Sequence, residues 1–149
     1  MRIAFATDHA AFAVRGDVIK FIESLGHTVT DYGYDKEASC DYPDFALEAC
    51  AAVAENKDAA GVLLCGTGIG MSIAANKVHG IRAAVVWSDE TAKLAKQHNN
   101  ANVLCIGVRT SAIAEICSRI KVWLDTSFET RHGQRIEKIS AIEGAQCKK

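Results

Sequence analysis

The sequence lacks the features that mark several broad classes of protein. Its formal net charge is −1 and its isoelectric point is about 6.5, so it carries no electrostatic footprint for nucleic acid or an anionic membrane surface. Its apolar runs are far too short to span a membrane, and its first residues do not resemble a secretory signal. We therefore expect a cytoplasmic protein without nucleic-acid or membrane partners.

Metal-binding and disulfide patterns are also missing. The chain has six cysteines but no Cys-x-x-Cys pair and no spacing typical of zinc ligands. They are Cys40, Cys50, Cys65, Cys105, Cys117 and Cys147. Without a secretory signal, reduced thiols are the expected state. The sequence therefore predicts no metal and no cofactor.

Short apolar runs alternate with segments of helical periodicity along the whole chain. We predict strands at 3–6, 27–30, 61–64, 82–86 and 102–106, and helices at 11–25, 43–55, 69–77, 89–97, 111–124 and 131–142. The only proline, Pro43, suits the first turn of its helix. One domain over residues 1–143 follows, with residues 144–149 as a tail. Strand–helix alternation predicts a three-layer, doubly wound α/β fold with a parallel five-stranded sheet in the flavodoxin-like order 2-1-3-4-5 and an additional C-terminal helix.

The segment 61–72 contains the strongest functional signal. A small apolar run ends at Cys65, and three glycines (Gly66, Gly68 and Gly70) separate it from the next helix. A glycine-rich turn before a helix lets backbone amides point outward toward an anion, and such a setting favours a thiolate. This pattern predicts a nucleophile or base beside an oxyanion hole.

The predicted topology brings a second group of polar residues to this turn. Strands one and three are neighbours at the switch point, where ligands bind in open α/β sheets. Asp8 and His9 follow strand one, so they should meet Cys65 and the hydroxyl of Thr67. The sequence thus places a carboxylate, an imidazole, a thiol and a hydroxyl in one crevice.

A second polar cluster does not fit that crevice, and a third lies near the start of the last predicted helix. His98 and Asn99 precede the last strand, and a strand of five residues separates its ends by about 17 Å. They form either a surface turn or part of a neighbouring subunit's site. Arg131 and Arg135 share one helix face near a helix start, where they can bind a phosphate or form an ordinary charged face.

Several segments together resemble ribose-5-phosphate isomerase type B, a sugar-phosphate isomerase family that includes galactose-6-phosphate isomerase subunits. The segments are 7–9, 41–45, 65–77, 80–84, 98–99, 102–104, 107–109, 131–132 and 135–136, in the family's order. The run from Cys65 to Lys77 is nearly a signature. The resemblance implies a metal-independent aldose–ketose isomerase that interconverts ribose 5-phosphate and ribulose 5-phosphate in the pentose phosphate pathway. It also implies a homodimer with shared sites, or a dimer of such dimers.

The resemblance also implies roles for individual residues. Cys65 is the base and Thr67 assists it, while the amides from Gly66 to Gly70, including that of Ile69, hold the enediolate. His98 opens the sugar ring. The remaining residues bind substrate or phosphate: Asp8, His9, Tyr42 and Asn99 the sugar, and Arg109, Arg131 and Arg135 the phosphate. Family members often have Gly-Gly-Arg-His where this chain has Glu129-Thr130-Arg131-His132.

Three alternatives stay open at this point. A hexose 6-phosphate, such as allose or galactose 6-phosphate, could replace the pentose phosphate as substrate. A nucleotide-binding module is the second alternative, although Met71 replaces the third glycine of the fingerprint and no Gly-Lys-Ser/Thr follows. A Cys–His acyl transferase or hydrolase with Cys65 as nucleophile is the third.

Overall fold

The computed structural model describes residues 1–55 and 60–146 and has a parallel five-stranded sheet at its centre. The strands are β1 (Arg2–Thr7), β2 (Thr28–Asp31), β3 (Ala60–Cys65), β4 (Ala83–Val85) and β5 (Val103–Gly107). The predicted fold class is confirmed, but the strand order is β2-β1-β3-β5-β4 and not 2-1-3-4-5. All of β5 is buried whereas β4 is short and half-buried, so the more apolar strand takes the inner position.

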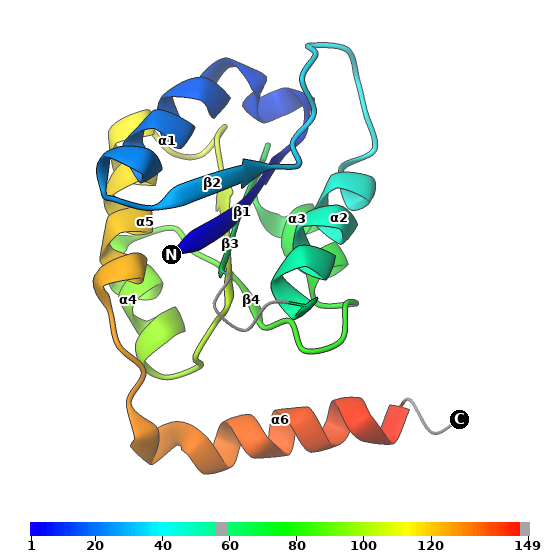
Figure 1. The fold of residues 1–149 in the computed structure, drawn as a ribbon, viewed down its shortest axis with the longest axis vertical. Helices are drawn as coiled ribbons and strands as arrows, with labels where there is room; N and C mark the ends of the chain where they lie inside the picture. Colours follow the sequence, from blue (N-terminus) through cyan, green and yellow to red (C-terminus); the bar gives the residue numbers. More distant parts are fainter. Residues whose placement is uncertain (56–59, 147–149) are drawn as a thin grey trace.

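Helices cover both faces of the sheet (Figure 1). One face packs against α1 (Phe12–Ser24), α4 (Asp89–Gln97) and α5 (Ile113–Asp125), and the other against α2 (Tyr42–Glu55) and α3 (Ile69–Ala75). Short 3-10 helices η1 (His9–Ala11) and η2 (Thr130–His132) complete the elements before the last helix. Every predicted helix is therefore present, with ends that differ by a few residues.

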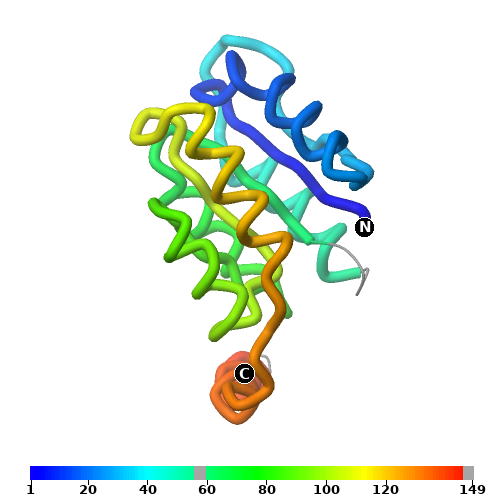
Figure 2. The backbone as a smooth tube through the Cα atoms, turned by 90° about the vertical axis from the view of Figure 1, so that its left-hand side faces the viewer, coloured from blue at the N-terminus to red at the C-terminus, as the bar shows by residue number. Residues whose placement is uncertain are grey.

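The last helix, α6 (Gly133–Gln146), stands apart from the three layers. It follows residues 126–129 and lies beyond the end of the sheet, as Figures 1 and 2 show from two directions. The helix continues to Gln146, so the expectation of a tail starting at residue 144 is wrong for residues 144–146, and residues 147–149 lie outside the described part. No helix within residues 1–55 and 60–146 is long and apolar enough to cross a membrane.

Strand register decides which loops meet. Thr7 of β1 pairs with Leu64 of β3, and Cys65 pairs with Gly107 of β5. The turns after β1, β3 and β5 therefore lie side by side at the carboxyl edge of the sheet. His98 ends α4, and its chain enters β5 at Val103 from the opposite, amino edge.

Candidate active site

The turn after β3 holds the thiol of Cys65 in a defined position. Cys65 is 4% exposed, and the Gly68 N–H donates to its Sγ over 3.1 Å. Gly68 has a φ of 77°, and a Cβ on it would lie 3.0 Å from the carbonyl carbon of Ile106. Glycine is required there both for the left-handed conformation and for the close approach to β5.

Thr67 lies in the same turn and is exposed. Its Oγ1 accepts a hydrogen bond of 3.3 Å from the Ile69 N–H. Two of the amides expected to hold an enediolate, those of Gly68 and Ile69, thus donate to the thiol and the hydroxyl in the free protein. A bound oxyanion would compete for these donors.

Asp8 and His9 follow β1 at the carboxyl edge of the sheet, which is also the edge of the Cys65 turn. The Asp8 N–H donates to the carbonyl of Leu64 over 3.2 Å, and its carboxylate caps η1 through the Ala10 N–H. The Cys40 N–H donates to Nδ1 of His9 over 3.3 Å. An Nδ1 that accepts leaves the proton of the neutral ring on Nε2, so His9 can donate to a ligand. The contribution of Cys40 was not predicted from the sequence.

Tyr42 and Arg109 both lie against the glycine-rich turn. A Cβ on Gly70 would lie 2.6 Å from Cζ of Tyr42, so the phenol packs directly on the turn. The Arg109 N–H donates to the carbonyl of Gly66 over 3.0 Å, and a Cβ on Gly66 would lie 3.2 Å from the Arg109 Nη1. Arg109 therefore belongs to the carboxyl edge, together with Cys65.

A second polar cluster forms at the amino edge. The half-buried ring of His98 lies 4.3 Å from the ring of His132, centroid to centroid. Arg135 Nη1 lies 2.8 Å from Nδ1 of His132. Burial lowers the pKa of His132, and the positive charges of Arg131, His98 and Arg135 lower it further. A neutral His132 can accept the hydrogen bond that Arg135 donates.

Glu129 also belongs to this cluster, although no motif in the sequence indicates a functional role for it. Arg131 donates to its Oε2 from Nε over 2.6 Å, and the side-chain amide of Gln97 donates to its Oε1. The hydrogen bond from Arg131 lowers the pKa of Glu129. Asn99, which follows His98 at the end of α4, is exposed.

His98, Glu129 and His132 are the one group of metal-ligand type among the described residues, with their ligand atoms within 4.8 Å of one another. Two of these three side chains already interact with a guanidinium group. Arg131 pairs with the carboxylate of Glu129, and Arg135 contacts Nδ1 of His132. Two arginines against one carboxylate leave the cluster positive, which repels a cation and attracts an anion. The cluster suits a phosphate better than a metal.

The predicted site residues thus fall into two groups that one chain does not bring together. The carboxyl edge holds Asp8, His9, Tyr42, Cys65, Gly66, Thr67, Gly68, Ile69, Gly70 and Arg109, and the amino edge holds His98, Asn99, Arg131 and Arg135. β5 spans the sheet between the two edges, about 17 Å for its five residues. The three arginines that the resemblance assigns to the phosphate are therefore divided between the edges.

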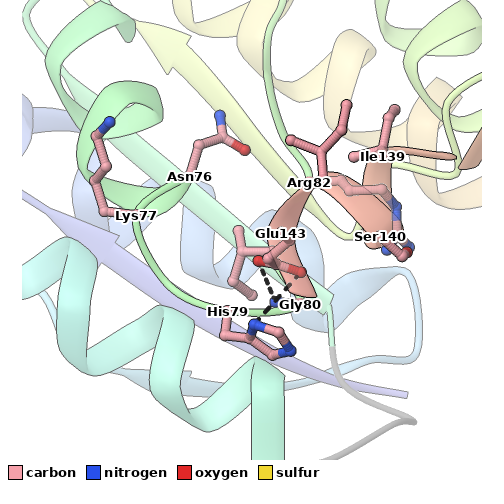
Figure 3. A pocket seen from close by; sticks show the side chains of 10 residues that line it. Asn76, Lys77, His79, Gly80, Arg82, Ile139, Ser140 and Glu143 are labelled. Atoms are coloured by element: carbon pink, nitrogen blue, oxygen red, sulfur yellow. Dashed lines mark hydrogen bonds and ion pairs between the residues drawn. The ribbon is translucent and has the colours of Figure 1, made fainter. Parts of the chain in front are cut away.

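A cavity of about 360 Å³ lies elsewhere, between α6 and the segment that follows α3. Figure 3 shows Glu143 of α6 reaching the Gly80 N–H and His79 across it. None of the predicted site residues lines this cavity. It separates α6 from the domain and contains no part of the candidate site.

These features define an α/β protein whose candidate site combines a buried thiol, a glycine-rich turn and arginines divided between the two edges of the sheet. The chain belongs to the Ribose/Galactose Isomerase family, whose model matches residues 3–139. It is 40% identical over 143 residues to ribose-5-phosphate isomerase B of Escherichia coli, covering 95% of this chain and 96% of that protein.

Solved structures agree with this assignment. The type B ribose 5-phosphate isomerase of Leishmania infantum is 46% identical with a TM-score of 0.93, over 97% of each chain. The Mycoplasma genitalium ribose-5-phosphate isomerase B with bound ribulose-5-phosphate is 39% identical with a TM-score of 0.92, over 96% of each chain. A D-erythrulose-4-phosphate isomerase of Pectobacterium atrosepticum is 39% identical, over 96% of this chain and 95% of that protein.

Proposed function

We propose that this protein is an aldose–ketose isomerase that interconverts D-ribose 5-phosphate and D-ribulose 5-phosphate through an enediolate. The observation that carries the proposal is the thiol of Cys65, which receives the Gly68 N–H in a turn flanked by Asp8. Family membership favours this activity over a nucleotide-binding module or a Cys–His acyl transferase. The reaction belongs to the non-oxidative part of the pentose phosphate pathway.

The chemistry needs one base and a stabilised oxyanion. Cys65 removes the proton from C2 of the open-chain aldose, and the electrons move onto the C1 carbonyl oxygen to form the enediolate. The amides of the turn from Gly66 to Gly70 hold the developing negative charge, and Thr67 assists. The proton of the C2 hydroxyl then moves to O1, so that the negative charge lies on O2, and return of the carbon-bound proton from Cys65 to C1 gives the ketose with its carbonyl at C2. These proton transfers require no cofactor, and we expect the enzyme to be metal-independent.

The amino edge supplies the remaining functions. His98 donates a proton to open the furanose ring, a task that suits an imidazole near neutral pH. Asn99 binds the sugar, while Arg131 and Arg135 hold the phosphate together with Arg109. Because Cys65 and His98 lie at opposite edges of one sheet, both can act on one substrate only when they come from different chains.

We therefore propose a two-fold homodimer with two equivalent shared sites, which is the smallest closed assembly that satisfies this geometry. Exposed apolar side chains next to the thiol support a partner surface there. Ile69 and Ile73 on α3 are 55% and 59% exposed, and they share one helix face because they are four residues apart. Pairing of two such dimers is compatible with the same argument. We assign the enzyme to the cytoplasm.

A substrate panel tests the proposal. Purified protein is assayed with ribose 5-phosphate, allose 6-phosphate, galactose 6-phosphate and erythrulose 4-phosphate, and kcat/KM is compared between them. We expect the highest value for ribose 5-phosphate. A higher value for a hexose 6-phosphate would make the hexose isomerase the correct assignment, and covalent adducts on Cys65 without isomerisation would favour acyl transfer.

A further inference from the structure

The carboxylate of Glu129 lies among the positive side chains of the amino edge and is fixed from two directions. Arg131 contacts Oε2 through Nε and Nη2, each at 2.6 Å. The side-chain amide of Gln97 donates to Oε1, and the Glu129 N–H donates to the Gln97 carbonyl over 2.9 Å. The end of α4 thus holds the carboxylate against the guanidinium.

Carboxylate and phosphate oxygens accept hydrogen bonds from a guanidinium in the same way. Glu129 therefore occupies donors of Arg131 that a phosphate would use. Arg135 differs, because its contact is the neutral, buried ring of His132 at 2.8 Å. Within residues 1–55 and 60–146, Arg131 therefore pairs with a carboxylate, whereas Arg135 forms no such pair.

We propose that Glu129 is an internal competitor for the phosphate of the substrate at Arg131. It acts in two ways: Arg131 must exchange the carboxylate for the phosphate, and the negative charge of Glu129 repels a phosphate that binds nearby. Glu129 thus weakens phosphate binding and speeds the release of both sugar phosphates. This inference rests on the proposed function only in assigning the phosphate of the sugar to Arg131.

The side chain of Arg131 is 67% exposed and that of Glu129 is 34% exposed, so solvent screens the ion pair. The effect on binding is accordingly that of an exposed pair, about two- to fivefold. It applies to ligands that carry a phosphate and not to unphosphorylated ribose. This selectivity separates competition for the guanidinium from a general disturbance of the site.

The decisive variant is Glu129→Gln, which keeps the size and an oxygen acceptor but removes the charge. We expect the dissociation constant for inorganic phosphate, measured by calorimetry on the full chain, to fall about two- to fivefold. The KM for ribose 5-phosphate should fall by the same factor. In the Arg131→Ala background, Glu129→Gln should lose most of this effect. Glu137→Gln on the exposed surface of α6 makes the same charge change and should leave phosphate binding unaltered.

Unchanged or weaker phosphate binding in Glu129→Gln would overturn the proposal, because the carboxylate would then only support Arg131 or the fold. Thermal unfolding shows whether the variant is folded, and Glu129→Ala provides the same comparison if the glutamine is not tolerated. The proposal is also overturned if both variants bind phosphate more weakly than the wild-type protein does. A wild-type protein that binds phosphate but does not isomerise ribose 5-phosphate contradicts the proposed function alone, since the phosphate titration still tests Glu129.

Discussion

The two edges of the sheet position their functional groups by different physical means. At the carboxyl edge, Cys65 and Asp8 are buried and are placed by strand register and backbone hydrogen bonds. At the amino edge, Arg131 is largely exposed and is held by another side chain, that of Glu129. The edge with the proposed base is thus held by strand pairing and backbone hydrogen bonds, whereas the edge with His98 and most of the proposed phosphate contacts is built from side-chain pairs that a ligand can rearrange.

The sharpest test of the carboxyl edge is Cys65→Ala. Removing the proton acceptor should lower kcat by about a hundredfold to ten-thousandfold while the protein stays folded and still binds the substrate. Cys50→Ala is the matched control, because burial raises the pKa of that thiol to about 12. It should reduce the free energy of unfolding by about 1 kcal/mol and leave kcat intact. Substantial turnover by folded Cys65→Ala would move the base elsewhere.

Mixing subunits tests whether the two edges act on one substrate. Inactive Cys65→Ala and inactive His98→Ala proteins, co-expressed or exchanged by mild denaturation, should regenerate activity. Each heterodimer carries one site with both lesions and one with neither, so it should approach about half of the wild-type activity. Heterodimer formation is verified with differently tagged chains. Verified heterodimers without activity would place both residues in one chain's site or leave His98 without a catalytic role.

The arginines test whether the phosphate binds across both edges. Arg109→Ala, Arg131→Ala and Arg135→Ala should each raise the KM for ribose 5-phosphate about tenfold to a hundredfold, the effect of losing a charge-assisted contact. Turnover of unphosphorylated ribose should change far less. If only Arg109→Ala raises the KM, the phosphate binds at the carboxyl edge. If only Arg131→Ala and Arg135→Ala raise it, the phosphate binds at the amino edge. Equal losses on both sugars would indicate a structural role.

The smallest expected effect is that of chelation. Activity should survive exhaustive dialysis against a chelator, because the proposed steps are proton transfers between the substrate, Cys65 and His98. The assay compares kcat before and after dialysis and after adding back divalent metals. If chelation removes the activity and a divalent metal restores it, the enzyme needs a metal, and the cluster around Glu129 is a metal site and not an anion site.

Most of the fold followed from the sequence because strand–helix alternation is a strong, local signal. The positions of β4 and β5 did not follow, since both read as short apolar strands and only their burial separates the inner strand from the edge strand. The end of α6 was also missed, since the predicted helix stops at residue 142 whereas α6 continues to Gln146.

Some contacts of the candidate site could be predicted from the sequence, and others could not. The meeting of Asp8 with the Cys65 turn was predictable, because parallel strands bring their carboxyl ends to one edge. The contact of Cys40 with His9 joins residues 31 apart in the sequence, and the bond between Gln97 and Glu129 joins residues 32 apart. No periodic pattern in the sequence predicts either contact.

The close contact of the turns after β3 and β5 also limits how the enzyme can move. A Cβ on Gly107 would lie 2.6 Å from the carbonyl carbon of Thr67, and Val108 and Arg109 donate their N–H groups to Cys65 and Gly66. We therefore expect the thiol, its amides and the backbone of Arg109 to move together. Any closure around a substrate then has to come from segments outside this pair of turns.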